Sequence, residues 1–129
     1  MRTPATATST PSGSAPGSRA AALSEYGGIA WPMPGHEGPG KVYGYGRAAS
    51  REELTRRYQQ LQLERVLPQL GRGLSALVYT QLTDVEEEVN GLFTYDREEL
   101  KPQAAALRRV NATLAAEFAR VTGAPPAQD

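Results

Sequence analysis

Apolar residues recur at helical spacing after Ser50, which predicts an amphipathic helix in the middle of the chain. Ser50 and Glu53 have the spacing of a capping box, in which the hydroxyl and the carboxylate each accept a backbone N–H bond at the helix start. Pro68 weakens the last turns, and Gly71 and Gly73 end the helix. Its apolar stripe consists of Leu54, Tyr58, Leu61, Leu67 and Leu70.

A second helix is predicted near the C-terminal end of the chain. Pro102 suits the first turn, and Gly123 ends the helix. The stripe of the second helix consists of Leu107, Val110, Leu114, Phe118 and Val121.

Residues 74–80 form a continuous run of small and apolar side chains, which is typical of a parallel strand buried on both faces. Residues 19–23 read Arg-Ala-Ala-Ala-Leu and are ambiguous, because alanine prefers helix to strand. If they end a strand, residues 25–80 make one βαβ crossover, and the fold class is α/β.

The two ends of the chain have the composition of disordered segments. Residues 1–22 are mainly Ser, Thr, Ala, Pro and Gly, too few apolar groups to offset the entropy of ordering. They lack the apolar region of a secretory signal, and a low-complexity tail is favoured over a transit peptide. We therefore expect a domain over residues 23–123 between a disordered tail and a disordered C-terminus, residues 124–129.

Residues 29–47 are predicted to form a long loop, because glycine and proline interrupt every regular pattern. The aromatic residues of this loop, which could stack on sugar rings or pack onto the domain, are Trp31, Tyr43 and Tyr45. Residues 35–41 have the spacing of a phosphate-binding loop, but Val42 follows where Ser or Thr is needed. His36 has no second histidine at ligand spacing, so we expect neither a metal site nor a cofactor.

Composition narrows the classes of partner. Basic and acidic residues number 14 each, so the formal net charge is zero, and we expect no nucleic acid and no membrane as partner. Cysteine is absent, which excludes disulfides and thiolate chemistry. We expect a cytoplasmic protein.

Polar groups follow the predicted strand at residues 74–80. Asp84 comes just after its C-terminal end, where α/β folds place functional groups. Glu87 and Glu88 are interpreted as a solvated acidic loop, since Gly91 comes two places too late for a calcium-binding loop.

Residues 74–96, LSALVYTQLTDVEEEVNGLFTYD, closely resemble the last barrel strand and following loop of glycoside hydrolase family 2, which contains β-galactosidases and β-glucuronidases. Residues 24–28, SEYGG, resemble the segment of that family that carries the nucleophilic Glu. The resemblance implies that Glu25 is the nucleophile of a retaining mechanism on a carbohydrate substrate. It also implies that the substrate-binding residues are Tyr26, Trp31, Gln81 and Asp84.

The family's acid/base Glu follows an Asn, and this sequence contains no Asn-Glu pair. A complete (β/α)8 TIM barrel has eight strands and about 250 residues. We therefore expect a C-terminal barrel fragment with the last two βα units, inactive alone and open to complementation by an upstream barrel fragment. The alternative is a non-catalytic helical interaction module that self-associates or binds a partner through its apolar helix faces.

Overall fold

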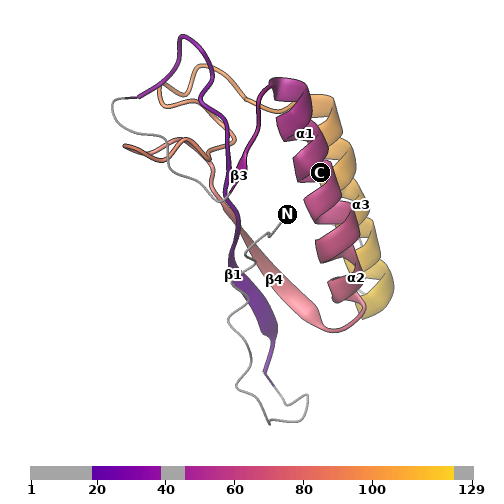
Figure 1. Cartoon of the computed structure of the whole chain (residues 1–129). Coiled ribbons are helices and arrows are strands. Elements are labelled where there is room, and N and C mark those ends of the chain that lie inside the picture. Colours follow the sequence, from indigo (N-terminus) through magenta and orange to yellow (C-terminus); the bar gives the residue numbers. More distant parts are fainter. Residues whose placement is uncertain (1–18, 39–45, 124–129) are drawn as a thin grey trace.

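The computed structural model describes residues 19–38 and 46–123. The segments 1–18 and 124–129, both predicted to be disordered, lie outside the described residues, as do Tyr43 and Tyr45. What is described is a mixed α/β fold in which helices cover one face of a parallel strand pair (Figure 1).

Two parallel strands form the centre of the fold. Strand β1 (Ala21–Gly27) pairs with β4 (Leu74–Thr80), with Leu23 opposite Leu77 and Gly27 opposite Thr80. The strand predicted at residues 74–80 and the crossover leading to it are confirmed. The alanine-rich segment is a strand as well, and it begins before the domain boundary predicted at Leu23, because pairing with β4 outweighs the helix preference of alanine.

The connection between the strands is a continuous helical rod made of α1 (Arg51–Gln60), η1 (Leu61–Val66) and α2 (Leu67–Leu70). The capping box is confirmed: the Ser50 hydroxyl accepts the N–H of Glu53 at 3.1 Å. The Glu53 carboxylate accepts the N–H of Ala49 at 2.8 Å, one residue further back than the motif predicts.

The middle segment of the rod, η1, is π-helical, so its turns are wider than those of α1. The N–H of Leu67 donates to the carbonyl of Gln62, five residues back, just ahead of Pro68. Pro68 lies in α2, directly after these wider turns, and the rod ends at Gly71.

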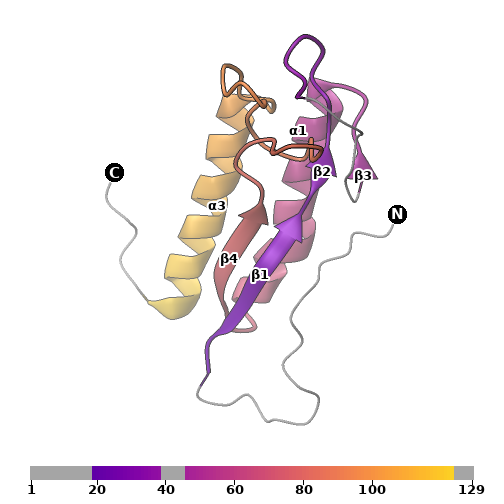
Figure 2. The same ribbon diagram turned by 90° about the vertical axis from the view of Figure 1, so that its left-hand side faces the viewer.

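The second helix, α3 (Ala104–Thr122), begins just after Pro102, as predicted to within two residues. It ends at Gly123, whose φ of 68° is the left-handed conformation of a helix C-cap. Both helices lie on the same side of the strands (Figures 1 and 2).

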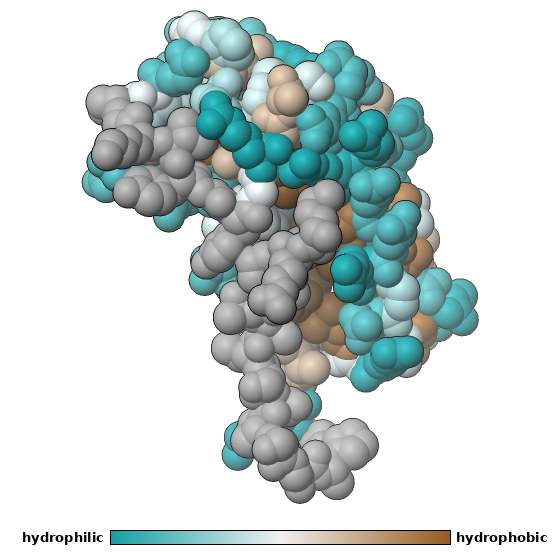
Figure 3. All heavy atoms as spheres, in the orientation of Figure 1, coloured by the Kyte–Doolittle hydropathy of each residue, from teal (hydrophilic) through white to brown (hydrophobic). Residues whose placement is uncertain are grey.

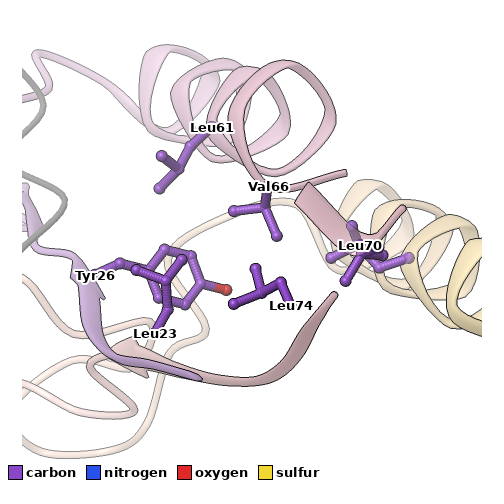
Figure 4. Packing of buried hydrophobic residues seen from close by; sticks show 7 residues of the cluster. Leu23, Tyr26, Leu61, Val66, Leu70 and Leu74 are labelled. Carbon is purple, nitrogen blue, oxygen red and sulfur yellow. The ribbon is translucent and has the colours of Figure 1, made fainter. Parts of the chain in front are cut away.

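The main core lies between the helices and the sheet. Leucines and a valine of the rod point toward side chains of β1 and β4 (Figure 4). The buried residues of this core are Leu23, Tyr26, Leu61, Val66, Leu70, Leu74 and Leu114. The apolar helix faces that the sequence offered as partner surfaces are thus packed within the chain.

A smaller cluster lies beyond the carboxyl end of β1. Strands β2 (Ile29–Ala30) and β3 (Gly46–Arg47) form a short parallel pair within what was predicted as one loop. Ile29 packs with Ala48 and Leu54, and Trp31 covers this cluster.

Among the residues that the structure describes, no helix lies on the opposite face of the sheet (Figure 2). Strand β4 was predicted to be buried on both faces; this is wrong, because both helices lie on one side. Val78 is 57% exposed on β4, and Ser75 and Ala76 are exposed as well. Within the described part of the chain, β1 and β4 pair only with each other, so each has an unpaired edge.

Hydrophobic side chains gather between the sheet and the helices in the lower half of the molecule, and hydrophilic residues cover the outer side of the helices (Figure 3). Among residues 19–38 and 46–123, no helix has the length and apolar character needed to cross a membrane.

The face of the rod that packs on the sheet can be tested with two leucines from the same segment. Leu61 is 7% exposed and Leu63 is 37% exposed. We expect Leu61→Ala to lower the free energy of unfolding by about 2–5 kcal/mol, because it leaves a cavity in the core. Leu63→Ala should cost less than about 1 kcal/mol. Urea unfolding followed by circular dichroism measures both, and equal losses would contradict the packing.

Candidate functional site

Glu25 lies in an irregularity of the strand pair. Leu23 is opposite Leu77 and Tyr26 is opposite Tyr79, so two residues of β1 face the single residue Val78 of β4. This two-against-one count is a β-bulge, a device that re-aims side chains and is common next to active sites. Ser24 and Glu25, the two bulged residues, are both exposed, whereas their neighbours Leu23 and Tyr26 are buried.

The side chain of Glu25 is open to solvent in the described structure, because Glu25 is exposed. Two residues further along, Gly27 ends the strand with a φ of 99°. A Cβ at Gly27 would come within 2.5 Å of the Tyr79 ring, so only glycine fits here. The N–H of Gly28 donates to the carbonyl of Thr80 at 2.8 Å, which holds the carboxyl ends of both strands together.

Tyr26 faces the helices. Its side chain is 4% exposed, and its hydroxyl shares a hydrogen bond of 3.1 Å with the side-chain amide of Gln62. Its ring packs edge-on against Tyr79, which in turn packs against Tyr58. Burial raises the pKa of the Tyr26 hydroxyl, which stays neutral. Substrate binding by Tyr26 remains a prediction, and its described contacts are those of a core residue.

Gln81 comes directly after β4. It therefore lies at the same end of the strand pair as Glu25, the end formed by the carboxyl ends of β1 and β4. Its side-chain amide donates to Asn90 Oδ1 at 2.6 Å and to Glu88 Oε2 at 2.7 Å. Its backbone carbonyl accepts the N–H of Leu92 at 2.9 Å. Gln81 is half-buried and fixes the acidic loop, whose Glu87 and Glu88 are exposed as predicted.

Asp84 is buried and paired with Lys101. The two side chains are 2% and 0% exposed, and Lys101 Nζ donates to Asp84 Oδ1 at 2.6 Å. The same oxygen accepts the N–H of Gly91 at 2.9 Å. A Cβ at Gly91 would lie 2.2 Å from the backbone N of Asp84, so this close approach requires glycine.

Lys101 uses its other two ammonium hydrogens on backbone carbonyls, those of Trp31 at 2.8 Å and Val89 at 3.0 Å. The three acceptors come from the segment after β2 and from the loop after β4, so one ammonium joins these segments. Burial lowers the pKa of Lys101, and the Asp84 carboxylate acts in the opposite direction. Sequence reasoning missed Lys101, although a buried Asp84 requires a cation nearby.

Trp31 is half-buried, with its ring against the cluster of Ile29, Ala48 and Leu54. Its backbone N–H donates to the carbonyl of Val89 at 2.9 Å. Packing onto the domain, one of the two roles left open for this ring, is therefore observed. Stacking on a sugar remains a prediction.

His36 meets two acidic residues from a distant part of the chain. Its Nδ1 lies 2.6 Å from Asp96 Oδ2 and 3.9 Å from Glu98 Oε2. The hydrogen bond to Asp96 raises the pKa of His36. Hydrogen bonds from Thr94 and from the N–H of Glu98 lower the pKa of Asp96 to about 2. Residue spacing around His36 gave no sign of these partners, because Asp96 is 60 residues away in the sequence.

Glu25, by contrast, has no hydrogen bond or ion pair with any other side chain in the part of the chain that the structure describes. The loops that carry Trp31 and Gln81 continue beyond the same end of the strand pair (Figure 2). The carboxylate of Glu25 therefore lies just before the carboxyl end of β1, and the segments that carry Trp31 and Gln81 lie beyond that end.

No protein-family model matches the chain, and no curated protein matches it either. The resemblance to glycoside hydrolase family 2 therefore rests on the quoted residues.

The buried ion pair can be tested by removing each partner. We expect Lys101→Met to lower the free energy of unfolding by about 3–5 kcal/mol, because it leaves the Asp84 carboxylate buried without a cation. Adding Asp84→Asn should recover part of this loss, since the orphaned charge is then gone. Urea unfolding gives the energies. Arg108→Met, which replaces an exposed cation, serves as the matched control, and a cost as large as that of Lys101→Met would contradict a special role for the buried pair.

Proposed function

We propose that this chain is the C-terminal part of the catalytic barrel of a retaining β-glycosidase, with Glu25 as its nucleophile. The observation that carries the proposal is the bulge in β1, which turns Glu25 out of the core next to the carboxyl end of a parallel strand. Barrel enzymes place their catalytic residues at the carboxyl ends of strands.

The chemistry assigned to Glu25 needs an ionised carboxylate within reach of the anomeric carbon. Its oxygen attacks the anomeric carbon, and the bond from that carbon to the leaving oxygen breaks as a second carboxylic acid protonates it. Water activated by the second group then releases the sugar. The two carboxyl groups must be about 5 Å apart. The second one is assigned to a segment outside this chain, because the sequence contains no Asn-Glu pair.

The sheet supports a fragment of a larger barrel. Helices on one face and exposed side chains such as Val78 on the other match the outside and the inside of a barrel wall. The unpaired edges of β1 and β4 offer the backbone groups with which neighbouring strands would pair. An upstream barrel fragment is thus the partner that the proposal requires.

The residues beyond the strand ends have separate tasks in this proposal. Trp31 and Gln81 are half-buried and are the two assigned to the sugar. Asp84 is enclosed with Lys101, so its effect on substrate binding is to hold the loop that carries Gln81.

A chimera tests the proposal, in which residues 19–123 replace the last two βα units of a family 2 β-glycosidase. We expect it to hydrolyse aryl β-glycosides, whereas the 129-residue chain alone does not. Glu25→Gln should lower kcat by at least about 1000-fold, equal to about 4 kcal/mol of transition-state stabilisation. Glu64→Gln, an exposed acid on the helical rod, is the matched control and should leave kcat unchanged.

Chemical rescue separates a nucleophile from a carboxylate that only supports the fold. In Glu25→Ala, azide can enter the space left by the side chain and attack the anomeric carbon, giving a glycosyl azide of inverted configuration. A folded chimera that keeps its activity in Glu25→Gln would overturn the role of Glu25. A folded chimera without any activity would overturn the barrel assignment.

A further inference from the structure

We propose that His36, Asp96 and Glu98 bind a zinc ion that joins the loop after β2 to the loop before α3. The inference rests on the geometry of these three side chains and is independent of the glycosidase proposal.

The three side chains each present one possible ligand atom for zinc, and these atoms lie close together. Their ligand atoms all lie within 4.8 Å of one another. Zinc bonds of about 2.0–2.1 Å put tetrahedral ligands roughly 3.4 Å apart. From the distances of 2.6 Å to Asp96 and 3.9 Å to Glu98, His36 therefore needs shifts of less than about 1 Å.

The carboxylate of Asp96 is already oriented for this task. Its Oδ1 accepts the Thr94 hydroxyl and, at 3.0 Å, the N–H of Glu98, which leaves Oδ2 toward His36. Thr94 is itself fully buried, so the turn that carries Asp96 is anchored in the fold. Partners that fix a ligand in this way are typical of the surroundings of protein metal sites.

The ligand set selects for zinc over calcium or magnesium. An imidazole nitrogen suits zinc, copper and nickel, whereas calcium and magnesium take oxygen ligands alone. A neutral His36 and two carboxylates carry two negative charges, which balance the ion. Zinc takes the place of the proton between His36 and Asp96, and that proton is released to solvent. The fourth position faces water, since the side chain of Glu98 is 72% exposed.

The ion would link two segments that are distant in the sequence. His36 and Asp96 are 60 residues apart. Gly38 lies against the ring of Tyr95 next to them, where a Cβ would come within 2.7 Å of the ring. Zinc bound only to the folded state would raise the free energy of unfolding in proportion to the logarithm of its concentration.

Zinc binding in this chain can be assigned to one place, because His36 is the only histidine and cysteine is absent, so no other imidazole or thiolate competes for the ion. Untagged chain is titrated with zinc chloride by isothermal calorimetry, and the imidazole signals of the single histidine are followed by NMR. We expect one ion per chain, with movement of the His36 signals. His36→Gln should abolish the binding, and Asp96→Asn or Glu98→Gln should weaken it at least about 10-fold.

Two exposed acids of the same chain provide controls. Glu64→Gln and Glu87→Gln should leave zinc affinity unchanged. Binding that survives His36→Gln, calcium binding of equal strength at His36, or no binding at 1 mM zinc, about the weak limit for a specific site, would each overturn the proposal. Far-UV circular dichroism of every variant separates lost ligands from lost structure.

Discussion

The ammonium group of Lys101 is the constraint on which the loop side of this fold depends. A buried cation must be paired and hydrogen-bonded, because removing it from water costs several kcal/mol even after the surroundings relax. Lys101 meets this requirement with three acceptors, one carboxylate and two carbonyls, all within 3.0 Å. Each acceptor comes from a segment without regular structure, so one side chain links segments that no strand or helix joins.

The helix side of the fold depends on a different force. There the core is apolar, and it draws on β1, the helical rod and α3 at once. A two-stranded sheet has little stability of its own, and the helices stabilise it from one side only. The exposed Val78 and the unpaired strand edges are the result of this one-sided burial. The same features that leave the sheet incomplete here are those that further strands would cover in the proposed barrel.

Local chemistry was readable from the sequence, and long-range contacts were not. Ser50 and Glu53 set a helix start through bonds to nearby backbone, and Gly123 ends a helix with a left-handed φ, so spacing alone predicted both ends. The strand at β1 was ambiguous, because its pairing with β4 is not visible in five residues. The bulge at Glu25 was not predicted, since it is defined by the register of two strands distant in sequence. The burial of Val78 was overpredicted, because an apolar run does not reveal which faces are covered.

In the candidate site, too, only the features that depend on position along the chain could be predicted from the sequence. Asp84 stood out by its place after a strand, but its partner Lys101 and the meeting of His36 with Asp96 depend on how loops fold back in space. The structure then separates the acids by their partners. Glu53 is tied to a helix start, Asp84 to Lys101 and Asp96 to His36, and in each case the bond stabilises local structure. Glu25 has no such bond in the described part of the chain, and it is exposed in a bulge near the carboxyl end of β1. The exposed position of Glu25 in this bulge is the observation on which the proposed role of Glu25 rests, whereas Asp84 is enclosed by its bond to Lys101.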